Sequence, residues 1–222
     1  MNRETANPVW ESFWSLKRNH EWWTHAAPEI EEFVASQSAQ IRPDVLDLGC
    51  GLGRHAILFA QAGFRVTAVD GSPAAIRRLR EWADRLSLRV QTEVCDFLGG
   101  RMPPASFDII LSYNVIYHGR REKFAAAIDR VCALLRPGGL FYFTCPTRND
   151  GKYGFGRELA PHTFECEKSI TPGDIHYFAD EADLDELLSK FRLRERTKRE
   201  GRWNNEGEDQ FYSNWHVLAE KI

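Results

Sequence analysis

The stretch Val45–Arg54, with the sequence VLDLGCGLGR, decides the fold of this 222-residue chain. Its first half is almost entirely apolar, as a strand buried on both faces of a parallel sheet must be. Three glycines at alternate positions follow, and glycine adopts backbone angles that let the chain pass close to a ligand. The helix expected from Arg54 would offer its unpaired N–H groups to an anion. The segment therefore predicts a strand, a ligand-binding turn and a helix.

The same alternation continues along the chain and predicts a parallel sheet with helices on both faces. The expected strands are 45–48, 65–70, 88–93, 107–112 and 140–145, and the expected helices are 54–61, 73–86 and 121–135. Pro137-Gly138-Gly139 predicts a sharp turn before the last of these strands. A further helix is expected at about 180–190. The strand-like runs 193–200 and 210–220 then predict an antiparallel hairpin.

Two segments lie outside this alternation. Residues 8–42 predict two short helices, the first capped by Asn7 and the second beginning at Pro28. Their aromatic residues suit either a lid over a ligand or a core against the sheet. Residues 146–179 are rich in Gly, Pro, His and aromatics and are too long for a plain connection, so we expect an insertion on the substrate side. The whole chain, 1–222, is expected to form one domain.

Composition excludes several classes of function. A net charge of −3 offers no global attraction for nucleic acid or an anionic membrane. No apolar run is long enough to cross a bilayer, and the polar start is no signal peptide. The five cysteines follow no metal-binding spacing, so we predict a reduced, cytoplasmic protein without a metal site. Cys166, which lies in an expected loop, is the best candidate for a reactive thiol.

The glycine turn discriminates between two nucleoside cofactors. A dinucleotide site has Gly or Ala at the sixth position of its fingerprint, where helix and strand pack closely. Counting from Gly49, that position is Arg54. A pyrophosphate also gains nothing from Asp47, whereas a ligand that carries an amine does. NAD is therefore disfavoured.

The pattern Gly49-x-Gly51-x-Gly53 preceded by Asp47 resembles the first motif of class I S-adenosylmethionine (SAM) methyltransferases. The resemblance is close over residues 44–145 and architectural over 180–222. It implies a Rossmann-like doubly wound sheet, mostly parallel with a C-terminal antiparallel hairpin, plus an N-terminal helical lid. The runs 51–56 and 62–64 resemble the small-molecule branch that includes tellurite-resistance-type enzymes. SAM would be the cofactor and S-adenosylhomocysteine the product.

The resemblance also implies roles for residues at the strand ends. The methionine end of SAM would lie on the glycine turn, the ribose hydroxyls on an acid closing the second strand, and adenine beside an acid–aromatic pair. In order along the chain, the expected cofactor-binding residues are Asp47, Gly49, Gly51, Gly53, Asp70, Asp96, Phe97 and Asn114. The expected substrate-pocket residues are Trp10, Trp14, Tyr117 and Tyr153. Taken alone, Asp96 and Phe97 suit a turn and a core position equally well.

Methyl transfer from a sulfonium is an in-line displacement with a neutral leaving group, so positioning supplies most of the catalysis. A general base is needed only for an acceptor that must lose a proton. His118, which follows the fourth strand, is the first candidate, with His162 and His176 from the insertion as further ones. Each of the three also suits a hydrogen-bonded loop histidine.

The predicted function is methyl transfer from SAM to a small-molecule acceptor. One alternative is a non-catalytic SAM-binding sensor or partner protein, and another is a protein methyltransferase. A nucleic-acid methyltransferase is disfavoured by the net charge and by the lack of an Asp/Asn-Pro-Pro-Tyr/Phe motif after the fourth strand. We expect no nucleic-acid or membrane partner.

Overall fold

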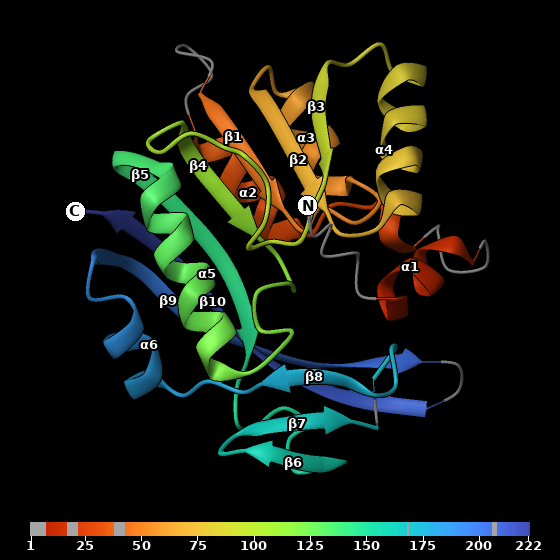
Figure 1. Cartoon of the computed structure of the whole chain (residues 1–222), viewed down its shortest axis with the longest axis vertical. Helices are drawn as coiled ribbons and strands as arrows, with labels where there is room; N and C mark the ends of the chain where they lie inside the picture. Colours follow the sequence, from red (N-terminus) through yellow and green to blue (C-terminus); the bar gives the residue numbers. More distant parts are fainter. Residues whose placement is uncertain (1–7, 17–21, 38–42, 168, 206–207) are drawn as a thin grey trace. The chain divides into compact units, whose positions relative to one another are not determined.

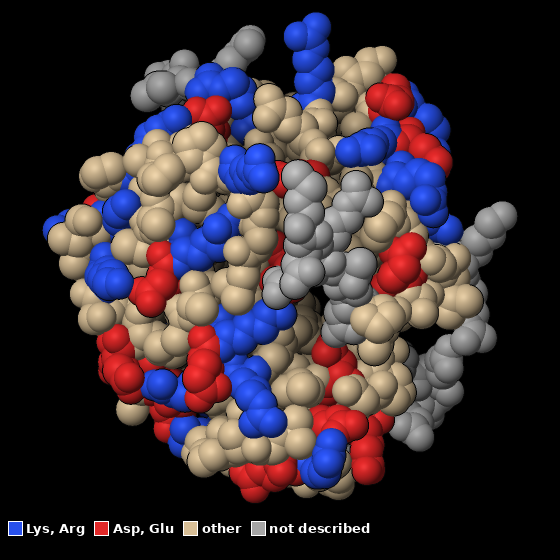
Figure 2. Space-filling model, viewed as in Figure 1, with Lys and Arg blue, Asp and Glu red and all other residues tan. Residues whose placement is uncertain are grey.

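The computed structural model describes residues 8–16, 22–37, 43–167, 169–205 and 208–222 (Figure 1). The chain divides into two compact units. The first comprises residues 1–111 with 134–136, and the second comprises residues 112–133 with 137–222. Figure 2 shows acidic and basic side chains interspersed over the visible face.

Four parallel strands form the sheet of the first unit. They are β1 (Asp44–Leu48), β2 (Arg65–Asp70), β3 (Val90–Val94) and β4 (Phe107–Ser112). Their order is β3-β2-β1-β4, and β1 pairs in parallel with both β2 and β4. The central strand is therefore the apolar one, as expected for a strand flanked on both sides. The carboxyl ends of β1 and β2 lie side by side in this register, which brings the residues after them together.

Helices α3 (Arg54–Gln61) and α4 (Pro73–Arg85) follow β1 and β2. Ser72 caps α4 by accepting a hydrogen bond from the backbone N–H of Ala75. The N-terminal segment forms α1 (Pro8–Ser15), the short 3-10 helix η2 (Trp22–Thr24) and α2 (Pro28–Ser36). Helix α1 packs against α4, and α2 packs against α3. The two predicted N-terminal helices are thus confirmed, while Asn7 lies outside the described residues.

The second unit contains α5 (Arg121–Leu134), the strands β5 (Leu135–Pro146), β9 (Phe191–Asn205) and β10 (Glu208–Lys221), and helix α6 (Glu181–Leu187). The order β5-β10-β9 is antiparallel throughout, which confirms the C-terminal hairpin. Two expectations were wrong in detail. Strand β5 begins at Leu135 rather than at 140. It runs through Gly138, whose φ is 74°, where a sharp turn was predicted.

Residues 146–179 contain a second sheet that the sequence pattern did not predict. Its strands β6 (Arg157–Ala160), β7 (Thr163–Cys166) and β8 (Asp174–Tyr177) are antiparallel in the order β6-β7-β8. Each has only four residues, too few for an alternating pattern to stand out. Phe164, Cys166 and Phe178 form a small core in this part, and the partly buried Tyr153 packs against it.

No helix in the described ranges is long and apolar enough to cross a membrane.

Gly53 begins α3 in a conformation that a side chain would strain. Its φ is 88°, and an added Cβ would lie 2.2 Å from Cδ1 of Leu79. We expect Gly53→Ala to lower the free energy of unfolding by the cost of a left-handed residue, about 1–2 kcal/mol, and by roughly 1–3 kcal/mol more for overpacking. Urea denaturation measures the loss.

Gly63→Ala is the matched control, because Gly63 has a φ of 89° but no atom within 4 Å of an added Cβ. It should show the backbone cost alone. Equal losses for the two variants would contradict the packing argument.

Candidate active site

The glycine turn after β1 is held by backbone and carboxylate acceptors from the end of β2. The backbone N–H groups of Gly49 and Cys50 donate to the carbonyl of Val69 at 2.8 and 2.9 Å. The N–H of Gly51 donates to Oδ2 of Asp70 at 2.8 Å. Gly49, Gly51 and Gly53 all have positive φ, between 53° and 88°. The turn therefore keeps its strained shape through hydrogen bonds that do not depend on a ligand.

Asp47, near the end of β1, has the least compensated carboxylate of the first unit. Asp47 is only 2% exposed, and its Oδ2 atom has no hydrogen-bond partner among the described residues. Burial raises the pKa of Asp47 to about 7, against a smaller lowering by a hydrogen bond from the Ala56 backbone. A buried carboxylate is costly unless it is paired. A cationic amine on a ligand is the partner that this position lacks.

Asp70, at the end of β2, lies beside the glycine turn as predicted. Oδ2 accepts from Gly51, and Oδ1 accepts from the backbone N–H of Ser72 at 2.8 Å. Burial raises the pKa of Asp70 to about 6 in spite of these two bonds. Each carboxylate oxygen has a second lone pair, so Asp70 can still accept from the hydroxyls of a ribose. It also joins the turn to the start of α4.

Helix α1 lies directly on this turn. The indole of Trp14 is 6% exposed, and a Cβ added to Gly51 would come within 2.9 Å of its Cζ2 atom. Glu11 accepts hydrogen bonds from the Ser72 hydroxyl and from the backbone N–H of Ala74 at the start of α4. The sequence did not indicate Glu11, because one acidic residue in a short helix has no distinctive signal. The N-terminal aromatic residues therefore contribute to the core and also form a wall against the glycine turn.

The predicted residues Asp96 and Phe97 have local structural contacts, and so does His55, which was not among the predicted site residues. Asp96 accepts from the backbone N–H of Leu98 at 2.9 Å, as a turn-forming acid does, and Phe97 is buried. His55 accepts from the backbone N–H of Ala27 at 3.2 Å at the start of α2. Burial and the neighbouring Arg54 hold the pKa of His55 well below its usual value, so this histidine is neutral.

Asn114, Tyr117 and His118 belong to the second unit. Asn114 has a φ of 59° and is fixed by Thr144, whose hydroxyl accepts from the Asn114 backbone and donates to its Oδ1, both at 2.8 Å. This locked turn places the Asn114 carbonyl oxygen 3.1 Å from Nε2 of His118. Tyr117 is buried, and its ring centroid lies 4.4 Å from that of His118.

The structure brings together His118 and His176, two of the three predicted catalytic histidines. Residues 118 and 176 form an antiparallel bridge, supported by a hydrogen bond from the Tyr177 backbone N–H to the Tyr117 carbonyl. Asp174 completes the group, with Oδ2 2.7 Å from Nδ1 of His118 and 3.7 Å from Nε2 of His176. Sequence reasoning missed Asp174. The available signal was the Asp-x-His spacing in a strand, which points both side chains to the same face.

His162, in the turn between β6 and β7, and Tyr153, which precedes β6, form a separate pair. The Tyr153 hydroxyl lies 2.7 Å from Nδ1 of His162, and its ring packs edge-on against Phe164 and Phe178. His162 has a φ of 58°, and its carbonyl accepts from the backbone of Phe178. The contacts of His162 among the described residues are those of a hydrogen-bonded loop histidine.

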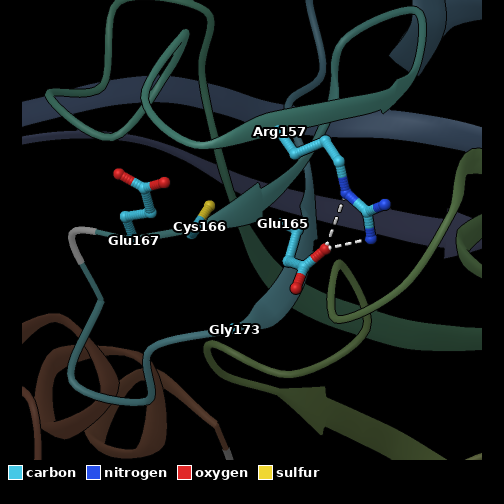
Figure 3. A pocket seen from close by; sticks show the side chains of 5 residues that line it. All are labelled: Arg157, Glu165, Cys166, Glu167 and Gly173. Carbon is cyan, nitrogen blue, oxygen red and sulfur yellow. Dashed lines mark hydrogen bonds and ion pairs between the residues drawn. The ribbon is translucent and has the colours of Figure 1, made fainter.

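Cys166 lies in strand β7 rather than in a loop. Its residue is 0% exposed, and burial raises the pKa of the thiol to about 12, which keeps it protonated and unreactive. The pocket in Figure 3 is lined by Arg157, Glu165, Cys166, Glu167 and Gly173. Within it Arg157 pairs with Glu165 at 2.6 Å, while Glu167 points away from that pair. None of the predicted site residues except Cys166, the candidate thiol, lines this pocket.

Comparison with known proteins agrees with the first motif. A family model described as a methyltransferase domain matches residues 45–139. A ubiquinone biosynthesis O-methyltransferase from Methylocella silvestris is 33% identical over 151 residues, which cover 63% of this chain and 57% of the relative. The chain thus spans little more than half the length of that relative.

Solved structures share the fold along most of the chain. A SAM-dependent methyltransferase from Methanosarcina mazei superposes with a TM-score of 0.72 at 20% identity, covering 89% of this chain and 99% of the other. TehB from Haemophilus influenzae gives a TM-score of 0.67 at 19% identity, with 96% and 67% coverage. The expected α/β class, mostly parallel with a C-terminal antiparallel hairpin, is confirmed.

The motif resembles that of class I SAM-dependent methyltransferases, residues 45–139 match a methyltransferase-domain model, and the fold is shared with SAM-dependent methyltransferases. SAM is the methyl donor that this resemblance implies. The residues of the first unit fit this molecule, because Oδ2 of Asp47 has no hydrogen-bond partner among the described residues and the glycines of the turn carry no side chain. The methionine amine would pair with the Asp47 carboxylate, and the ribose hydroxyls would donate hydrogen bonds to Asp70.

Asp47 should make stability depend on pH. Its pKa is raised from 3.8 to about 7, so the folded protein holds this proton more tightly than the unfolded chain. The contribution of Asp47 to stability is therefore most favourable below pH 4 and is lost as the pH rises towards 7. Asparagine does not ionise, so the Asp47→Asn variant does not lose this stability as the pH rises. We expect the variant to gain stability relative to the wild type, by up to about 4 kcal/mol, between pH 4 and pH 8.

Thermal or urea unfolding of the ligand-free protein across this range measures the effect. The control is Asp129→Asn, which alters an exposed carboxylate paired with Lys190. Its difference from the wild type should change far less over the same range. A constant difference for Asp47→Asn would show that Asp47 is charged and compensated in the fold.

Proposed function

We propose that this protein transfers the methyl group of SAM to a small-molecule acceptor. The observation that carries the proposal is the buried Asp47 carboxylate, whose Oδ2 atom has no partner beside a glycine turn that Asp70 holds open. The proposal is supported by relatives named ubiquinone biosynthesis O-methyltransferases, which point to an oxygen acceptor. One from Pseudomonas aeruginosa aligns with 75% of this chain at 25% identity.

The cofactor supplies the methyl group and a neutral leaving group. The chain's residues act by holding it: Asp47 pairs with the amine, Asp70 accepts from the ribose, and the glycines let the backbone approach. Such positioning can contribute about 7–11 kcal/mol to lowering the barrier. Trp14 closes one side of the glycine turn and excludes water there. Each of the residues Trp10, Trp14, Tyr117 and Tyr153 remains proposed as a contact of the acceptor.

An oxygen acceptor must lose a proton, and His118 is the residue proposed to govern that loss. In the structure both of its ring nitrogens already have partners, the Asn114 carbonyl and Asp174. A carbonyl only accepts, so Nε2 carries a hydrogen and cannot itself take a proton. The His118–Asp174 pair, rather than a free imidazole, is therefore the unit that would receive the acceptor's proton. His162 and His176 stay in the proposal as secondary candidates.

The experiment is an S-adenosylhomocysteine release assay with a panel of phenols, alcohols, thiols and amines. We expect acceptor-dependent turnover with at least one oxygen acceptor. Asp47→Asn should weaken SAM binding at least tenfold, because the amine loses a charged partner worth about 1.5–3 kcal/mol. Isothermal titration measures that affinity. Gly63→Ala, outside the glycine turn, should bind SAM like the wild type.

The other outcomes separate the alternatives. SAM binding without turnover on any acceptor would favour a sensor or partner protein. Transfer of label from SAM to protein in an extract, with no small-molecule product, would favour a protein methyltransferase. Failure to bind SAM would overturn the proposal altogether.

A further inference from the structure

His118, Asp174 and His176 form a group of electron-pair donors that the methyl-transfer proposal does not fully explain. One donor atom from each residue, two imidazole nitrogens and a carboxylate oxygen, lies within 4.8 Å of the other two. The side chains of His118, Asp174 and His176 are 12%, 5% and 4% exposed. All three belong to the second unit, so the group stands within one compact part of the chain.

The hydrogen on His118 is assigned by its neighbours. Nε2 lies 3.1 Å from the Asn114 carbonyl oxygen, which can only accept, so Nε2 is the N–H nitrogen. In a neutral imidazole Nδ1 then presents its lone pair to Asp174 Oδ2, which is 2.7 Å away. Two electron-rich atoms at that distance need a positive centre between them. A proton or a metal ion supplies such a centre.

A proton in that position leaves His176 unsatisfied. Its Nε2 is 3.7 Å from the same oxygen, beyond hydrogen-bond distance, and Nδ1 has no hydrogen-bond partner among the described residues. The residue is 3% exposed, so bulk water does not compensate. A buried imidazole without partners is costly. One cation placed among the three atoms would satisfy His118, Asp174 and His176 together.

We propose that His118 Nδ1, Asp174 Oδ2 and His176 Nε2 bind a divalent first-row transition metal ion, with Zn²⁺ as the reference case. Bonds of about 2.0–2.2 Å to nitrogen and oxygen in a tetrahedron place ligand atoms about 3.3–3.5 Å apart. The observed separations of 2.7 and 3.7 Å lie on either side of this range. Imidazole ligands favour zinc, iron, nickel or copper over Mg²⁺ and Ca²⁺, which prefer oxygen.

The surroundings of His118 match those of a metal ligand. Metal-binding histidines usually donate the other ring N–H to a backbone carbonyl or a carboxylate, which fixes the ring. Here the Asn114 carbonyl has that role, and Thr144 holds Asn114 in its left-handed conformation on both sides. Three protein ligands also leave a fourth position open, as catalytic zinc sites do. The site thus has a fixed first ligand and three protein ligands in total, so a fourth coordination position is left to a non-protein ligand.

The effect of such a metal ion on the acceptor rests on the proposed function. An acceptor hydroxyl at the open position would lose its proton more readily, because a bound cation lowers the pKa of coordinated oxygen. The metal would stabilise the resulting oxyanion, and the proton would pass to water.

The test is metal titration of the full chain, freed of any affinity tag and of metal by chelation, without SAM. We expect one Co²⁺ per chain with visible d–d absorption, displaced by Zn²⁺, and a rise in melting temperature with Zn²⁺. Asp174→Asn and His176→Gln should each weaken Zn²⁺ binding at least tenfold. His162→Gln is the matched control, since His162 lies in the same unit and pairs with Tyr153. It should bind like the wild type.

X-ray absorption of the zinc form separates this site from the five cysteines. A shell of nitrogen and oxygen alone is expected, and sulfur in the shell would place the ion elsewhere. No binding by wild-type protein that melts cooperatively would overturn the proposal, leaving a proton-linked structural triad. SAM affinity, measured in parallel, is expected to be independent of metal, so a failure here is distinct from a failure of the proposed function.

Discussion

The Asp70 carboxylate is the interaction on which the first unit depends. Its two oxygens accept from the backbone of Gly51 and of Ser72, so one side chain at the end of β2 fixes the glycine turn and the start of α4. Ser72 then donates to Glu11, which attaches α1 to the same point. Four segments are thus linked through Asp70 and Ser72. The raised pKa of Asp70, about 6, shows that the two bonds do not fully compensate its burial. Such incomplete compensation is typical of functional sites.

Sequence alone was sufficient for the parts of the fold where the chemistry is local. The apolar run at β1, the glycines after it and the Ser72-Pro73 helix start each dictate their own backbone, and all three are found as expected. The same reasoning placed Asp47 and Asp70 at neighbouring strand ends, because adjacent parallel strands finish at the same edge. Strand β5 was misjudged at its start, since the Pro-Gly-Gly turn signal is overridden by pairing within a long strand.

The site in the second unit was less accessible to such reasoning because it depends on pairing across the chain. His118 and His176 were named separately, and nothing in their spacing says that a β-bridge joins them. Asp174 was missed for a related reason. An acid in a four-residue strand has meaning only once its partner strand is known. Tyr153, predicted for the substrate pocket, and His162, predicted as a catalytic candidate, hydrogen-bond to each other beside a small aromatic core. Residue type alone suggested a functional role for His118, His176, Tyr153 and His162 alike. Only their tertiary contacts show that the first two lie beside Asp174 and the other two pair with each other.

Asp47 and Asp174 show how much a buried acid reveals about what it binds. Both are almost fully buried, yet their pKa values move in opposite directions. Burial dominates at Asp47, whereas at Asp174 burial alone would raise the pKa and the two neighbouring histidines more than reverse it. Asp47, whose Oδ2 atom has no hydrogen-bond partner among the described residues, is therefore suited to a cation from outside the chain, whereas Asp174 lies beside two histidines of the chain. In the second unit the His176 imidazole is a group without a hydrogen-bond partner among the described residues. Burial lowers the pKa of His176 to about 4, so this imidazole is neutral. A neutral imidazole beside a charged acid is a ligand for a metal ion, while an isolated buried carboxylate suits an amine. Each unit thus contains a buried polar group without a hydrogen-bond partner among the described residues. The Asp47 carboxylate suits an amine, and the His176 imidazole suits a metal ion.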